Sequence, residues 1–233
     1  MKVLVLGAGE AGDTSHWLVE NDGLLLAERF AHICHQLDAQ MICAVRAQDI
    51  RRHRIDSVIG LASPGAAIVP VSGDTGGAAC TALLCVRHIE PDDGLLILNV
   101  NEYLDIDYRY VIDSFRTRDL DAGVVVFPSI HPRYSHVRLE GGLIVEAAEK
   151  NPISRHASAG STWFARGGEF VAAAQEMIRK DAQVDGRFFI SLTLNEMVLR
   201  QKRCGSFEIE ARQYHPLKSA AQLASFENEG LAA

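Results

Sequence analysis

Glycines follow the first apolar run of the sequence at a spacing that could bring the backbone close to a phosphate. Residues 7–12 read GAGEAG, the pattern GxGxxG, directly after the apolar run 2–6. In a dinucleotide site the third glycine opens a helix and the second strand ends in an acid. Here Gly12 is followed by DTSHWLVENDG, which lacks a helical apolar period, and the second apolar run ends in Arg46. Both contexts disfavour an NAD or FAD site.

Two interpretations of these glycines remain open. The bare backbone N–H groups of Gly7 and Gly9 could hold the phosphates of a nucleotide without an immediate helix, as turns do in anion-binding nests. The same glycines could instead form a simple turn that leaves a buried strand.

A pair of aspartates is the candidate metal site. Asp105 and Asp107 form a DxD sequence just past another apolar run, and Glu102 lies nearby. Mg²⁺ and Mn²⁺ take oxygen ligands, so Asp105 and Asp107 could hold such an ion against a diphosphate. Alternatively, Asp107 could cap the helix that is predicted to begin near Tyr108.

Two further segments carry polar side chains that could contact a substrate. Glu149 and Lys150 could hold a sugar phosphate, with the Lys150 ammonium on the phosphate and Glu149 accepting a hydrogen bond from a hydroxyl, or they could be a surface ion pair on a turn. Asn195, on a predicted helix, could face outward or contact the substrate. The basic cluster 51–54 favours a solvated helix face.

The order of apolar runs and helical patterns predicts how these residues are positioned. Short strand-like runs alternate with helical periods, which is typical of an α/β three-layer sandwich with a mostly parallel central sheet. Strands are expected at 2–6, 41–45, 66–71, 94–98, 122–127 and 157–165, with a hairpin at 135–147; helices are expected at 25–37, 47–61, 79–86, 108–118, 168–180 and 190–198. We expect one domain over 1–233, with halves 1–128 and 129–233.

Composition excludes several classes of function. The 233 residues carry a net charge of −7, so nothing indicates nucleic acid as a partner. No apolar run approaches the ~20 residues that a membrane span requires, and the opening residues lack the features of a secretory signal. The five cysteines form no CxxC pair, which disfavours a disulfide framework or a zinc site. We expect a soluble cytoplasmic protein.

Five segments, in order along the chain, resemble the sugar-phosphate nucleotidyltransferases, which make NDP-sugars. More narrowly, they resemble the branch found in capsule and lipopolysaccharide gene sets. The segments are TGGAACTALL at 75–84, LLILNVNEYLDID at 95–107, AAEKNP at 147–152, AGSTWF at 159–164 and FFISLTLNEMV at 188–198. The resemblance implies a Rossmann-like fold of the nucleotidyltransferase and glycosyltransferase-A group.

The resemblance also implies a reaction and a set of site residues. A sugar 1-phosphate attacks the α-phosphate of an NTP and displaces pyrophosphate, with Mg²⁺ (or Mn²⁺) offsetting charge. The partners would then be an NTP or NDP-sugar and a sugar phosphate, and a homo-oligomer is left open. By position, Asn101 and Lys150 would be catalytic. The other implied contacts are Gly7 and Gly9 to the nucleotide, Thr75, Gly76 and Gly77 to the base, Asn99 to the metal loop, and Glu149, Lys150 and Asn195 to the sugar phosphate.

The chain departs from the family pattern at several of these positions. Glu10 and Ala11 stand where the family loop has Ser or Thr followed by Arg, and Asn101 stands where it has a metal-binding Asp. A Gly-Thr-Pro-Glu-Asp turn near the C-terminus is replaced by residues 216–221, PLKSAA. Three functions therefore stay open: a nucleotidyltransferase for surface polysaccharide synthesis, a catalytically silent homologue that binds a nucleotide or partner protein, and a DxD metal-dependent glycosyltransferase.

Overall fold

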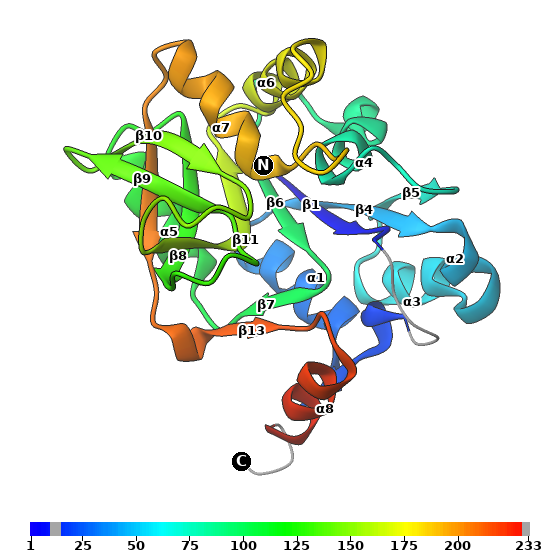
Figure 1. Cartoon of the computed structure of the whole chain (residues 1–233). Helices are drawn as coiled ribbons and strands as arrows, with labels where there is room; N and C mark the ends of the chain where they lie inside the picture. The colour runs from blue at the N-terminus through cyan, green and yellow to red at the C-terminus, as the bar shows by residue number, and fades with distance from the viewer. Residues whose placement is uncertain (10–14, 230–233) are drawn as a thin grey trace.

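Among residues 1–9 and 15–229, which the computed structural model describes, nine strands form one sheet in the order β5-β4-β1-β6-β11-β8-β12-β10-β9 (Figure 1). Strands β10 and β11 run opposite to the others. The strands are β1 (Lys2–Gly7), β4 (Gln40–Arg46), β5 (Ala67–Val71), β6 (Leu95–Asn99), β8 (Ala122–Pro128), β9 (His136–Glu140), β10 (Leu143–Ala148), β11 (His156–Phe164) and β12 (Cys204–Glu208).

Helices cover both faces of this sheet, so the predicted three-layer α/β sandwich is confirmed. One face is covered by α1 (Leu26–Gln36), α3 (Ile55–Ala62) and α5 (Tyr108–Thr117), and the other by α4 (Ala78–Leu84), α6 (Gly167–Arg179) and α7 (Ile190–Leu199) (Figure 1). The remaining α-helices are α2 (Ala47–His53), after β4, and α8 (Ala220–Glu229), near the C-terminus. Single 3-10 turns lie at His16–Leu18, Val86–His88 and Ala211–Gln213.

Along the central strands, side chains point alternately to the two faces of the sheet, and they form the two halves of the hydrophobic core. In β1, Val3 and Val5 pack on the α1 side, whereas Leu4 and Leu6 pack on the α4 and α6 side. Side chains of successive strand residues point to opposite faces, and a strand covered on both faces is apolar throughout. The unbroken apolar run at the start of the sequence is therefore the signature of a central strand.

The first four strands set the place of the functional site. β1 runs parallel to both β4 and β6, and β4 runs parallel to β5. Their carboxyl ends consequently meet at one edge of the sheet, where open α/β sheets bind ligands.

Two short antiparallel pairs lie outside the main sheet. β2 (Glu20–Asn21) pairs with β3 (Leu24–Leu25), and β7 (Glu102–Leu104) pairs with β13 (Tyr214–Pro216). The second pair brings a C-terminal segment against the loop that follows β6. The sequence patterns predict neither pair, nor β12 or α8.

The predicted helix over 47–61 is two helices. Arg54 separates α2 from α3 and adopts a left-handed backbone conformation with φ of 53°. Left-handed backbone at a residue other than glycine is uncommon, and position 54 carries neither glycine nor proline to indicate the break. No helix in the described part of the chain is long and apolar enough to cross a membrane.

Candidate functional site

A cleft of about 850 Å³ opens at the carboxyl ends of the parallel strands. Its lining includes the last residue of each of the first four strands of the sheet: Gly7, Arg46, Val71 and Asn99. From the second half of the chain the lining includes Glu149, Lys218 and residues of the segments 133–135, 158–162 and 187–191. Both halves of the sequence therefore contribute to one cavity.

Gly7 sits where a side chain would not fit. A Cβ atom there would lie 2.5 Å from Nε1 of Trp17, whose ring is fully buried beside the cleft. Around Gly9, in contrast, a Cβ would meet no atom of the described residues within 4 Å. The departures from the family loop at Glu10 and Ala11, together with Gly12, lie outside the described residues.

The turn that precedes α4 is fixed by packing against residues 187 and 188. Gly77 has φ of 120°, and a Cβ there would lie 2.5 Å from the carbonyl oxygen of Phe188. The Phe188 N–H donates to the Gly76 carbonyl at 2.8 Å, and the Thr75 and Thr81 hydroxyls are 2.6 Å apart. The turn therefore has one backbone conformation. Thr75 and Gly77 line the cleft, whereas Gly76 packs against Cys80.

A bidentate ion pair borders the same turn. Both terminal nitrogens of Arg187 donate to the carboxylate of Asp74 at 3.0 Å, and these hydrogen bonds lower the pKa of Asp74. Arg–carboxylate forks combine charge with fixed geometry. Arg187 and Asp74 both line the cleft.

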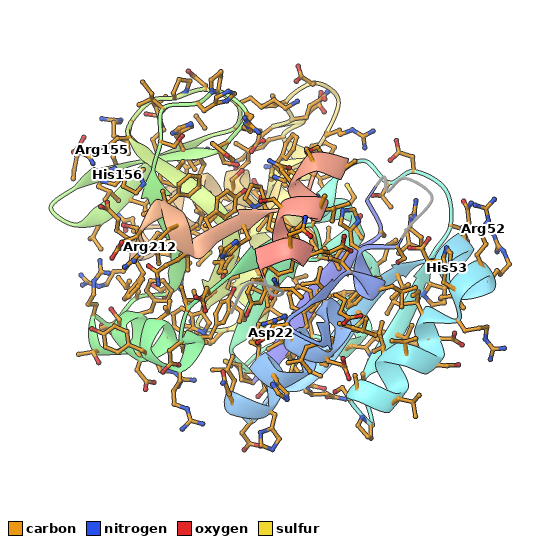
Figure 2. All side chains as sticks on the ribbon, turned by 90° about the horizontal axis from the view of Figure 1, so that it is seen from below. Asp22, Arg52, His53, Arg155, His156 and Arg212 are labelled. Carbon is orange, nitrogen blue, oxygen red and sulfur yellow. The ribbon has the colours of Figure 1, made fainter. Side chains whose placement is uncertain are left out.

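A second ion pair lies at the end of β4. Asp49 is buried, accepts a hydrogen bond of 2.8 Å from the Ser15 hydroxyl, and pairs with Arg46 at 2.7 Å. Arg51, one turn along α2, also lines the cleft, although it is exposed, as expected for the basic cluster 51–54. Figure 2 shows Arg52 and His53 of this cluster at the opposite side of the molecule from Arg155 and His156.

The most connected group of the site is the buried carboxylate of Glu102. It accepts hydrogen bonds from Asn99 at 2.8 Å, from the Tyr214 hydroxyl at 2.9 Å and from the Lys218 ammonium at 2.6 Å. Burial and the neighbouring carboxylate raise the pKa of Tyr214, which keeps the phenol protonated as a donor. A Cβ on Gly160, whose φ is 78°, would lie 1.6 Å from Oε2 of Glu102, so this carboxylate fills space that the glycine leaves.

Asn101 lies in the same loop. It lines the cleft, and its carbonyl oxygen accepts a hydrogen bond of 2.8 Å from the Leu217 N–H. The loop after β6 and the segment after β13 are thus joined through backbone and side chains.

Glu149 is a further acidic residue of the cleft. Its carboxylate accepts hydrogen bonds from the hydroxyls of Ser135 and Ser191, the latter at 3.0 Å. Burial raises its pKa, while the two hydroxyls and the charge of Lys218 act in the opposite direction. A carboxyl of this kind, bordered by hydroxyls and by Tyr134 and Arg133, can accept or share hydrogen bonds with a polyhydroxy ligand.

Several predicted site residues do not line the cleft as the described residues define it. Lys150 pairs with Asp185 at 2.8 Å on an exposed turn. Asn195 exchanges two hydrogen bonds with the backbone of Ala147, at 2.8 and 2.9 Å, and so joins α7 to β10. Its amide is used within the fold, which differs from both predicted roles.

The predicted metal ligands are also apart from the cleft. Asp107 caps α5, and its side chain accepts hydrogen bonds from the N–H groups of Arg109 and Tyr110. Asp105 is exposed, and its N–H donates to the Gln213 carbonyl. Of the two roles left open for Asp107, the structure places it in helix capping.

The oxygen atoms that the described residues offer in the cleft do not fit a Mg²⁺ or Mn²⁺ ion. Such ions need several oxygen ligands, usually with at least one free carboxylate. In the cleft, Glu102 is already engaged by an ammonium, a phenol and the amide of Asn99. Over residues 1–9 and 15–229, no three His, Cys, Asp or Glu side chains gather in a way that could hold a metal ion.

Comparison with known proteins places this architecture among solved structures. The chain superposes over 97% of its length on a nucleoside-diphosphate-sugar pyrophosphorylase from Vibrio cholerae, covering 99% of that chain, with a TM-score of 0.78 and 17% identity. The fold is that of the sugar nucleotidyltransferases. Protein-family models and curated sequences give no match.

Two further solved structures have a similar fold. A Bacillus anthracis protein assigned as a glucose-1-phosphate thymidylyltransferase, in complex with sucrose, has a TM-score of 0.75 at 17% identity, with 98% of this chain and 94% of that chain covered. A UDP-glucose pyrophosphorylase complexed with UDP-glucose has a TM-score of 0.74 at 11% identity, with 99% and 98% covered. At such identities the similarity establishes the shared fold.

Sequence reasoning missed several of the charged residues of the cleft. Arg46, Asp49, Arg187 and Lys218 were not predicted as site residues, although each lines the cavity. Arg46 carried a usable signal, because the last residue of a buried parallel strand lies at the ligand-binding edge. Lys218 carried only a positional signal, because it lies in the segment 216–221 that replaces the family's C-terminal turn; its place beside Glu102 depends on the pairing of β13 with β7.

Proposed function

We propose that this protein binds a nucleotide and a phosphorylated sugar in the cleft and transfers a nucleoside monophosphate from an NTP to a sugar 1-phosphate. The observation that carries the proposal is the cleft itself, formed at the carboxyl ends of β1, β4, β5 and β6 in a chain with the nucleotidyltransferase fold. In the proposed reaction a phosphate oxygen of the sugar 1-phosphate bonds to the α-phosphorus, the bond to the β-phosphate oxygen breaks, and pyrophosphate leaves.

The first half of the chain is the proposed nucleotide side. Gly7 and Gly9 leave the backbone open to a phosphate, and the rigid turn with Thr75 and Gly77 offers polar backbone groups to a base. Arg46 and Arg187, each fixed by an aspartate, supply positive charge nearby. Fixed dipoles and charges suit phosphoryl-type chemistry, which depends on positioning and charge neutralisation.

The second half is the proposed sugar-phosphate side. Glu149, with Ser135 and Ser191 as its partners, would accept hydrogen bonds from sugar hydroxyls, and Arg133 would face the phosphate. Lys150 would reach this phosphate only after leaving Asp185. The resemblance to capsule and lipopolysaccharide enzymes supports a role in surface polysaccharide synthesis.

Release of pyrophosphate tests the proposal. The purified protein would be incubated with each of the four NTPs and a panel of sugar 1-phosphates, with Mg²⁺ and separately with EDTA. We expect release with a restricted set of pairs and its loss in the variant Glu149→Ala. A folded protein that releases none with any pair, under either condition, would refute transfer.

A second candidate is a homologue that binds a nucleotide or NDP-sugar without transferring it. The neutral Asn101 at the position of the family's metal-binding Asp, together with the engagement of the nearby Glu102 by Lys218, favours it. A ligand-dependent rise in melting temperature with no pyrophosphate release would select this candidate. No observation favours the DxD glycosyltransferase, because Asp107 caps α5 and neither aspartate of the motif lines the cleft.

A further inference from the structure

Lys218 and Glu102 form a close ion pair inside the cleft, between segments that lie 116 positions apart in the sequence. The Nζ–Oε1 distance is 2.6 Å. The Glu102 side chain is 6% exposed, whereas that of Lys218 is 41% exposed and borders the cavity. A carboxylate this buried requires a compensating positive charge and hydrogen bonds. Lys218 supplies the charge from within the chain.

The backbone that carries Lys218 is anchored on both sides. The Leu217 N–H donates to the Asn101 carbonyl at 2.8 Å, and the Leu217 carbonyl oxygen lies 2.7 Å from Nε2 of His16. The preceding residues pair with β7. The ammonium is therefore held at a defined place beside the loop that follows β6.

The ammonium also has donors to spare for a ligand. A lysine ammonium has three N–H groups, and one of them points to Glu102. Its positive charge also acts on Glu149, where it opposes the rise in pKa that burial causes. Both residues line the same cleft.

The charge of the cleft suits an anion. The described residues of its lining include five Lys or Arg side chains and four Asp or Glu side chains. Arg46, Arg187 and Lys218 are each fixed by one of those acids. The arrangement resembles a set of preorganised cations with little reorganisation left on ligand binding.

We propose that the Lys218 ammonium is a built-in cation of the cleft, which occupies the place of a divalent metal ion beside Glu102 and binds a phosphate group of the ligand directly. The inference rests on the proposed function for the identity of the ligand, the phosphate part of a nucleotide. It adds that phosphate binding is independent of Mg²⁺.

Calorimetric titration of the full chain with inorganic pyrophosphate, and then with each NTP, tests this inference in EDTA and in Mg²⁺. We expect binding in EDTA, a change of less than about threefold on adding Mg²⁺, and a loss of about tenfold or more in Lys218→Met, the size expected for a charged hydrogen bond. Binding that requires Mg²⁺, an unchanged affinity in Lys218→Met, or no binding of any phosphate probe would overturn it.

The chain offers a closely matched control. Lys180 pairs with Glu196 at 2.7 Å, with side-chain exposures of 38% and 6%, but both residues lie away from the cleft. Lys180→Met should destabilise the fold to a degree similar to Lys218→Met while leaving phosphate affinity unchanged. An equal loss of affinity in both variants would assign the effect to folding and reject a specific role for Lys218.

A metal titration separates this inference from the proposed function. Electron paramagnetic resonance with Mn²⁺ alone measures how much of the ion the protein binds. The wild type and Glu102→Gln should bind the same amount, because no Mn²⁺ is expected at Glu102. A bound Mn²⁺ that this substitution abolishes would contradict the inference and leave nucleotidyl transfer intact. Phosphate binding in EDTA without pyrophosphate release from any substrate pair would have the opposite meaning. It would support phosphate binding by Lys218 and refute nucleotidyl transfer.

Discussion

Two carboxylates of the cleft have different environments. Glu102 is engaged by the Lys218 ammonium and two neutral donors, whereas among residues 1–9 and 15–229 the hydrogen-bond partners of Glu149 are hydroxyls. Burial disfavours the charged form of an acid unless a nearby cation compensates. Burial accordingly raises the pKa of Glu149, while its two hydroxyl partners act in the opposite direction.

Glu149 should make folding stability depend on pH. Because its pKa is higher in the folded than in the unfolded protein, the folded state binds the extra proton, and ionisation at higher pH removes stability. The loss begins near the unfolded value of about 4.3 and is complete above the raised folded value. We expect the melting temperature of Glu149→Gln, relative to wild type, to increase as pH rises from 4 to 8; a difference that stays constant with pH would contradict the raised pKa.

Gly160 should be intolerant of a side chain. Its φ of 78° and the 1.6 Å approach of a Cβ to Glu102 predict that Gly160→Ala costs about 2 kcal/mol or more of the free energy of unfolding. Gly60 is the control, since it lies in α3 with no atom within 4 Å of an added Cβ, and Gly60→Ala should stabilise by about 0.5–1 kcal/mol. Urea denaturation measures both; equal stabilities for the two variants would show that Glu102 moves freely.

At the scale of elements, hydrogen bonds between neighbouring helices, strands and turns position the residues of the site. α7 holds β10 through Asn195, and the turn before α4 is held by residues 187 and 188. Such contacts fix where Glu149 and Thr75 lie, although the residues that make them need not touch a ligand.

Asn195 should behave as a positioning residue. Asn195→Ala leaves the N–H and carbonyl of the buried Ala147 without their partners, at a cost of about 2–3 kcal/mol. Nucleotide affinity, measured by calorimetry below the melting transition, should change by less than about threefold. A large loss of affinity with unchanged stability would instead make Asn195 a substrate contact.

Asp107 should act as a helix cap. Asp107→Ala is expected to cost about 1 kcal/mol, the usual value for a lost N-cap, and Asp107→Asn should restore most of it. Thermal denaturation with and without Mn²⁺ and an NDP-sugar checks this. A metal-dependent shift in the wild type that either substitution abolishes would support the DxD alternative.

The sequence predicts the long elements well because their patterns are local. The apolar run at β1 and the helical periods of α1, α5 and α6 fall within a residue or two of the observed ends. β7 and β13 have three residues each and form only by pairing across more than a hundred positions, so no local period indicates them. The same limit hides Lys218, whose partner Glu102 belongs to the other segment.

For the whole molecule, the site is a product of topology. Gly7, Gly9, Glu149 and the turn before α4 were predicted as site residues from local motifs, and the structure brings them to one cleft, apart from Gly76 of that turn. Lys150 and the DxD pair carried equally local signals, yet the fold places them elsewhere. A motif identifies residue types at a spacing, whereas the strand order decides which of them meet.

Hydrogen exchange followed by mass spectrometry tests most directly whether this cleft is the ligand site. With saturating NTP, we expect slower exchange of backbone amides in 71–79 and 99–102, and with a sugar 1-phosphate added, further protection in 133–136 and 189–191. Protection confined to segments outside the cleft, such as residues 207–213 from the end of β12 to the last 3-10 turn, would contradict the assignment, as would no change in a protein shown by calorimetry to bind the nucleotide.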